Sequence, residues 1–122
     1  MFRKANRPHS KYVQLAIECI KKHIDENPFQ YKTAAALLEQ VSAPNRNLVE
    51  KAFKDIYDAG IKEYQVRQRL EASKLFLNQG MSIKLIAHKC FYSGQSTYCR
   101  AFKKAFNLTP TEWQSMDVII QQ

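Results

Sequence analysis

The sequence predicts an all-α fold of about seven helices, built as two similar halves joined by one long helix. Apolar residues recur mainly at helical spacing, strand-like alternation is scarce, and only three Gly and four Pro interrupt the 122 residues. The chain also repeats itself at an interval of 49 positions. Lys51-Ala52-Phe53-Lys54 returns as Arg100-Ala101-Phe102-Lys103, and Glu63-Tyr64 returns as Glu112-Trp113. A repeat of this length indicates one supersecondary unit used twice.

Three helices are expected in the first half. Ser10 can cap the first, whose inward stripe recurs at three and four residues until Asn27-Pro28 ends it; the stripe is Val13, Ala16, Ile17, Ile20 and Ile24. Thr33 can cap a second helix from Ala34 to Val41, which Ser42-Ala43-Pro44-Asn45 interrupts. A third is expected from Arg46 to Tyr57, closed by Asp58-Ala59-Gly60, with four residues facing inward: Val49, Ala52, Phe53 and Ile56.

A longer helix from about Ile61 to Asn78 is expected to connect the halves, and Gln79-Gly80 closes it. Ser82 can cap a fifth helix reaching Cys90, followed by a turn at Phe91-Tyr92-Ser93-Gly94. The inward residues of a sixth helix are Tyr98, Ala101, Phe102 and Phe106. Thr109-Pro110-Thr111-Glu112 is a capping box that starts the last helix.

These elements predict one domain over residues 1–122. It comprises a first subdomain at about 11–60, a connecting helix at about 61–78, a second subdomain at about 79–114 and a tail at 115–122. The residues leave open whether the apolar part of the tail, Val118-Ile119-Ile120, packs on the last helix or docks a partner.

The balance of charge favours a polyanionic partner. Lys and Arg number 19 against 11 Asp and Glu, which gives a net charge of +8 and a pI near 9.5. Nucleic acid is the first candidate and an acidic membrane the second. The three cysteines form no C-x-x-C pair, and no apolar run reaches the roughly 18 residues of a membrane span. A cytoplasmic protein without a membrane partner is therefore expected.

The second helix of each repeated pair carries the residue types that address DNA. In a helix-turn-helix, this helix enters the major groove while the first crosses the backbone. The residues predicted to contact bases are Asn45, Arg46, Asn47, Glu50, Gln95, Ser96, Thr97 and Arg100, of which Arg46, Gln95 and Arg100 are the strongest candidates. The residues predicted to contact phosphates are Thr33, Lys51, Lys54, Ser82, Lys103, Lys104 and Thr109. The alternatives are a plain solvated helix face and, for the three hydroxyl residues, helix capping alone.

No catalytic, cofactor-binding or metal-binding residues are expected. The sequence has no Gly-rich phosphate loop and no H-E-x-x-H, and its three histidines, His9, His23 and His88, lie on different elements. The rival to a DNA-binding function is a helical protein-interaction module that kept the fold without specific DNA binding. Loss of affinity with salt separates the two, because each neutralised phosphate releases counterions.

Two segments carry a resemblance to a known family. The run from Ser82 to Pro110, with Ile86-Ala87, Phe102-Lys103-Lys104 and Thr109-Pro110, resembles the signature of AraC/XylS-type transcription regulators, and Arg69-Leu70-Glu71-Ala72 resembles their connecting helix. The resemblance covers about residues 11–114. It implies a monomer with two helix-turn-helix units in successive major-groove segments of double-stranded DNA, acting mostly as an activator that contacts RNA polymerase. No small-molecule ligand is implied, because the sensor domain of larger members has no counterpart here.

The sequence departs from the family pattern in three ways. Phe91 stands where Gly is usual in the second turn, Leu38 stands where a small Ala is usual, and Ser42-Ala43-Pro44 makes an unusual first turn. We therefore expect the first unit's helices to cross differently from the second's. The sequence does not decide between a complete regulator and a fragment of a longer one.

Overall fold

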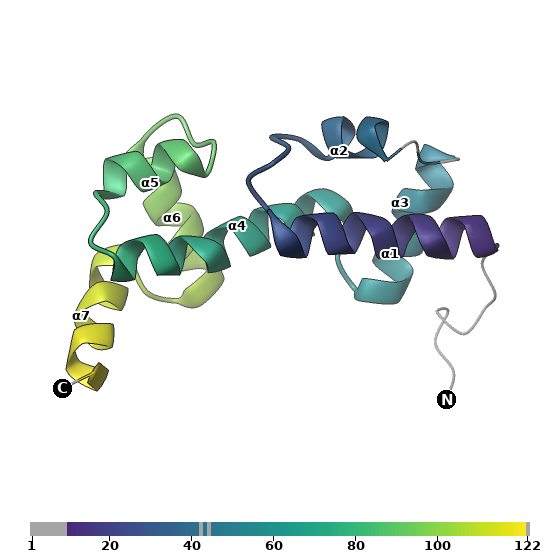
Figure 1. Ribbon diagram of the computed structural model, residues 1–122. Coiled ribbons are helices and arrows are strands. Elements are labelled where there is room, and N and C mark those ends of the chain that lie inside the picture. The colour runs from purple at the N-terminus through teal and green to yellow at the C-terminus, as the bar shows by residue number, and fades with distance from the viewer. Residues whose placement is uncertain (1–9, 42, 44, 122) are drawn as a thin grey trace. The chain divides into compact units, whose positions relative to one another are not determined.

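The computed structural model describes residues 10–41, 43 and 45–121, with side chains as far as Met116, and its regular structure over these residues is entirely helical (Figure 1). The helices are α1 (Lys11–Glu26), α2 (Ala34–Gln40), α3 (Arg46–Tyr57), α4 (Ile61–Asn78), α5 (Ile83–Lys89), α6 (Gln95–Phe106) and α7 (Pro110–Gln121). The predicted all-α class with seven helices is confirmed. His9, Ser42 and Pro44, and the side chains of Val118, Ile119 and Ile120, lie outside the described residues.

The 49-residue repeat is present in the helix boundaries. The bounds of α2 and α3 return as those of α5 and α6, and α7 begins 49 residues after α4. Asp58 and Asn107 end α3 and α6 in the same left-handed conformation, with φ of 63° and 64°. The first helix of each pair ends one residue earlier than predicted, so that Val41 and Cys90 are C-caps.

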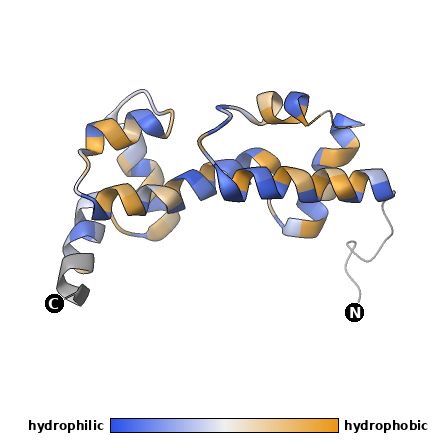
Figure 2. Cartoon of the chain, in the orientation of Figure 1, coloured by the Kyte–Doolittle hydropathy of each residue, from blue (hydrophilic) through white to orange (hydrophobic). Residues whose placement is uncertain are grey.

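The chain divides into two compact units, Met1–Val66 (unit 1) and Arg67–Gln122 (unit 2), and the boundary falls inside α4. Unit 1 has its own core, in which α1 contributes one apolar residue per turn (orange in Figure 2). Phe53 of α3 is fully buried, and its ring meets those of Tyr57 and Tyr64 edge-on at centroid distances of 4.7 and 5.7 Å. The fully or nearly buried core residues are Val13, Ile17, Ile20, Ile24, Leu37, Leu38, Val49, Ala52, Phe53 and Ile61.

Unit 2 has a core rich in aromatic residues. Tyr98 and Phe102 of α6 are fully buried, and the ring of Phe102 lies 5.9 Å from that of Tyr98 and 4.7 Å from that of Phe106. The core is completed by Leu70 and Leu77 of α4, by Ile86 and Ala87 of α5, and by Cys90, the C-cap of α5. Burial raises the pKa of the Cys90 thiol to about 12, so this cysteine behaves as a neutral, small apolar residue.

The repeat extends to hydrogen bonds. Gln65 of α4 is buried, and its amide Nε2 donates to the carbonyl oxygens of Tyr31 and Thr33, at 3.1 and 3.4 Å, in the segment that leads into α2. Gln114 lies 49 residues later, on α7, and donates to the carbonyl oxygen of Leu77 at 2.9 Å. Leu77 is in the last turn of α4, just before the segment that leads into α5. In each unit, therefore, a glutamine amide holds the chain ahead of the first repeated helix.

Each unit also holds a lysine ammonium between two aromatic rings that occupy equivalent positions. In unit 1, Nζ of Lys21 lies 5.7 Å from the ring centroids of both Tyr57 and Tyr64. In unit 2, Nζ of Lys74 lies 3.9 Å from the ring centroid of Phe106 and 4.8 Å from that of Trp113. Because Lys21 belongs to α1 and Lys74 to α4, the second half of α4 does for unit 2 what α1 does for unit 1.

The capping box at the start of α7 is formed by two reciprocal hydrogen bonds. Thr109 Oγ1 accepts from the Glu112 N–H at 3.1 Å, and the Thr109 N–H donates to Glu112 Oε1 at 2.8 Å. Hydrogen bonding to the Thr109 backbone N–H, and to a smaller extent to the Thr109 side chain, holds the pKa of Glu112 below its usual 4.5. The contribution of this carboxylate to the free energy of unfolding is therefore fully present above pH 4.5, and it is lost as the pH falls through the lowered pKa.

Replacing Thr109 by Ala is expected to lower the free energy of unfolding by about 1 kcal/mol, because the cap of α7 is removed. Urea unfolding at neutral pH measures the loss, with the fluorescence of Trp113 as probe. Thr111→Ala is the matched control, because Thr111 is exposed in the same helical turn. Equal unfolding midpoints for Thr109→Ala and the wild type would contradict the capping role.

Candidate nucleic-acid interface

In unit 1, the predicted contact residues share the solvent side of α3. Val49, Ala52 and Phe53 turn inward, whereas the polar residues Asn45, Arg46, Asn47, Lys51 and Lys54 are exposed and Glu50 is partly exposed. Asn45 is the N-cap of the helix, and its Oδ1 accepts from the Leu48 N–H at 3.1 Å. The amide oxygen of Asn45 therefore serves the helix, and its amide nitrogen is the group left to address a base.

Arg46 lies along the surface of α3 beside a carboxylate. Its Nε is 3.3 Å from Oε2 of Glu50, and both side chains are about half exposed. An exposed ion pair one helical turn apart contributes roughly 0.3–0.5 kcal/mol. A phosphate or base edge can therefore displace Glu50 from Arg46 at little cost. This pairing places the two residues next to each other on the predicted reading face, which their spacing alone suggested but did not establish.

In unit 2, the predicted contact residues share the solvent side of α6. Tyr98 and Phe102 turn inward, and all six predicted residues are exposed: Gln95, Ser96, Thr97, Arg100, Lys103 and Lys104. The helix carries three cations and no carboxylate, whereas α3 carries Glu50 and Asp55 among its three cations. Gly94 is the N-cap and supplies no side-chain acceptor, so side chains leave the first N–H groups of α6 available.

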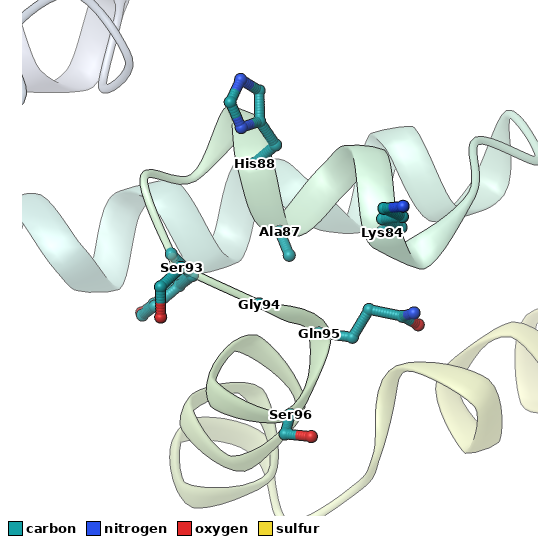
Figure 3. Close-up of a pocket in the computed structure, with 8 residues that line it drawn as sticks. Lys84, Ala87, His88, Ser93, Gly94, Gln95 and Ser96 are labelled. Atoms are coloured by element: carbon teal, nitrogen blue, oxygen red, sulfur yellow. The ribbon is translucent and has the colours of Figure 1, made fainter.

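A pocket of about 420 Å³ opens between α5 and the start of α6 (Figure 3). The side chain of Ala87 points from α5 toward Gly94 and Gln95. The lining residues are Lys84, Ala87, His88, Tyr92, Ser93, Gly94, Gln95 and Ser96. Sequence reasoning did not place Lys84 or His88 at the site. Lys84 and His88 are four residues apart, so they share one face of α5, and this spacing was the signal in the sequence that could have identified them.

The three hydroxyl residues predicted to contact phosphate are helix caps. Thr33 Oγ1 accepts from the Ala36 N–H at 3.1 Å, Ser82 Oγ accepts from the Leu85 N–H at 3.2 Å, and Thr109 takes part in the capping box. Capping alone accounts for the presence of these residues. Their contact with phosphate stays a prediction.

The described residues hold no cluster of three or more His, Cys, Asp or Glu side chains that could bind a metal ion. Within the same part of the chain, no helix is long and apolar enough to cross a membrane. All three cysteines, Cys19, Cys90 and Cys99, have free thiols.

Comparison with known proteins places these helices in a regulatory context. A family described as "Helix-turn-helix domain" matches residues 38–116. The chain is 39% identical over 67 residues to the probable transcription factor PqrA of Proteus vulgaris, a match covering 54% of this chain and 55% of PqrA. It is 29% identical over 102 residues to the F1 operon positive regulatory protein of Yersinia pestis, covering 83% of this chain and 34% of that protein. The chain thus spans between about a third and just over half of the length of these relatives.

Among solved structures, the fold is similar to the C-terminal domain of AraT, a response regulator from Geobacillus stearothermophilus. The TM-score is 0.67 at 21% identity, and the match covers 88% of this chain and 86% of that one. At this level of identity, the similarity establishes the fold. The residues that read a target are not carried over from it.

Proposed function

This chain belongs to the AraC-type helix-turn-helix family of bacterial transcription regulators, and on that premise we propose that it binds specific double-stranded DNA sequences through α3 and α6 and activates transcription. The family is not one of enzymes. The observation that carries the proposal is the similarity of α3 and α6. Each has a buried aromatic residue on its inner side and amide and cationic side chains on its exposed side. An α-helix with such a face fits the major groove of B-DNA.

The two helices are proposed to divide the contacts in the same way. At the leading end of each, Arg46 and Gln95 occupy equivalent positions, and both side chains form bidentate hydrogen bonds with purine edges, Arg with guanine and Gln with adenine. Arg100 adds a second candidate for guanine on α6. Further along each helix, Lys51, Lys54, Lys103 and Lys104 are proposed to neutralise phosphates, which positions the helices without reading sequence.

The proposed target is a pair of short boxes on one duplex. One polypeptide with two recognition helices needs no second copy to read both boxes, and successive major-groove segments on one face of DNA recur about every 34 Å. We therefore propose that the protein acts as a monomer, in the cytoplasm where bacterial DNA lies. Activation, with RNA polymerase as partner, is proposed from the family and from the "positive regulatory" name of the Yersinia pestis relative.

A salt titration of binding to a random-sequence duplex tests the DNA-binding part of this proposal. Four lysines neutralising four phosphates give a slope of log affinity against log salt near −3.6, so affinity is expected to fall about 150-fold between ~50 and ~200 mM salt. Fluorescence anisotropy of a labelled duplex measures it. Lys22→Ala, at an exposed position of α1, is a control expected to leave the slope unchanged, whereas Lys103→Ala is expected to reduce it by about one.

Selection of sequences from a random pool then tests the two-helix arrangement. Two short boxes at a fixed separation support it, and a single box would reduce the reading surface to one unit. Absence of binding at low salt would refute the DNA-binding function and favour a protein-interaction module.

A further inference from the structure

The turn between α5 and α6 is closed over a buried arginine of α4. Arg69 is only 6% exposed, and its Cζ lies 4.7 Å from the centroid of the Phe91 ring, within the range of a cation–π contact. Phe91 itself is 39% exposed, so the contact joins a buried arginine to a residue at the surface. Burial lowers the pKa of Arg69, while the neighbouring charge of Arg69 partly opposes the rise that burial causes in the pKa of Cys90 and Tyr92. Cys90 and Tyr92, the two neighbours of Phe91 in the sequence, thus interact electrostatically with the same guanidinium.

Phe91 adopts a backbone conformation that favours glycine. Its φ is 69°, in the left-handed region where a bulky side chain is strained. The conformation closes α5, because the Phe91 N–H donates to the His88 carbonyl at 3.0 Å and the Tyr92 N–H donates to the Ala87 carbonyl at 2.9 Å. A phenylalanine held in this conformation needs a compensating interaction, and the contact of its ring with Arg69 supplies one.

The same face of α4 also fixes α6. One turn beyond Arg69, the buried Ser73 Oγ donates to the Leu70 carbonyl at 2.6 Å and lies 2.8 Å from the hydroxyl of Tyr98, which donates to it. Tyr98 is on α6, between Gln95 and Arg100. Arg69 thus contacts the turn that precedes α6, and Ser73 contacts the helix itself, so α4 constrains both the starting point of α6 and its rotation.

We propose that Arg69 is a positioning residue for DNA reading: through the ring of Phe91 it clamps the α5–α6 turn and so sets the direction in which α6 presents Gln95 and Arg100 to the major groove. The inference rests on the proposed DNA-binding function and adds a residue that touches no DNA. A misdirected α6 keeps its lysines near phosphates, because flexible cationic side chains tolerate small shifts, whereas bidentate base contacts need fixed geometry. Loss of the clamp therefore affects specific binding more than non-specific binding.

The test replaces Phe91 rather than the buried arginine. Phe91→Gly removes the ring and relieves the left-handed strain, so the variant is expected to fold, with a melting temperature within about 5 °C of wild type. Its preference for the selected duplex over random duplex is expected to fall roughly tenfold, the scale of one base contact, with random-duplex affinity unchanged within about twofold. Phe91→Tyr keeps the ring over Arg69 and is expected to retain the wild-type preference.

Leu85→Ala is the matched control, because Leu85 is an exposed apolar residue of α5 outside the contact with Arg69. Affinities are compared well below the melting temperature of every variant. A wild-type preference in Phe91→Gly would overturn the clamp, and so would an equal loss in Phe91→Tyr and Phe91→Gly. In both cases wild-type DNA binding persists, so the proposed function survives; a wild-type protein that binds no duplex overturns both together.

Discussion

Phe102→Ala is expected to lower the free energy of unfolding of unit 2 by about 3–5 kcal/mol. The ring is fully buried and lies against those of Tyr98 and Phe106, at centroid distances of 5.9 and 4.7 Å. Truncation loses these contacts and leaves a cavity, because close-packed neighbours relax only in part. At such a loss, much of the stability of a small domain is gone.

The measurement uses the chain's single tryptophan, which lies in unit 2, as a local probe in urea unfolding. Phe53→Ala is the matched variant, because Phe53 is the fully buried equivalent in unit 1. Circular dichroism should show a similar loss for Phe53→Ala, whereas the Trp113 transition shifts only as far as the two units unfold together. A Phe102→Ala protein with the wild-type midpoint would show that the ring contributes nothing to the core.

Arg100→Ala is expected to weaken binding to the selected duplex by about 1–3 kcal/mol, or roughly 5- to 150-fold, and to relax the preference at one base pair. Arg100 is exposed near the middle of the polar face of α6, and its fork of donors suits the guanine edge. Binding to random duplex should fall much less, since a base contact contributes little where the base is wrong.

Lys51→Ala, at the equivalent position of α3, is the control for Arg100→Ala. As a phosphate contact, Lys51 is expected to weaken binding to all sequences by the same factor and to reduce the salt slope by about one. Competition between selected and random duplexes at one salt concentration separates the two patterns. If Arg100→Ala weakened both duplexes equally, Arg100 would be assigned to phosphate as well.

Helix positions could be predicted from this sequence because their signals are local. Ser10, Thr33 and Ser82, which were predicted as caps, each accept a hydrogen bond from the backbone N–H three residues on, and such caps can be recognised from a few neighbouring residues. The inward stripes followed from helical spacing in the same way. The repeat strengthened each assignment, because a signal seen in one half could be checked in the other.

Contacts between distant residues could not be predicted. Gln65 and Gln114 look like ordinary surface residues of a helix, and only the folded chain shows which carbonyl groups they reach. The departure at Phe91 was visible in the sequence, but its left-handed backbone and its contact with Arg69 depend on packing between α4 and the turn. The candidate site was predictable as a set of outward residues, whereas the Arg46–Glu50 pairing and the pocket beside Ala87 depend on side-chain geometry.

The passage of α4 through both units determines how the chain can be dissected. A cut before the helix, after Gly60, deprives unit 1 of the Tyr64 ring against Phe53 and of the Gln65 amide that holds the segment before α2. A cut after it removes from unit 2 the side chains that contact Phe91, Tyr98 and Trp113. Stand-alone fragments therefore need this helix twice, once at the end of the first piece and again at the beginning of the second.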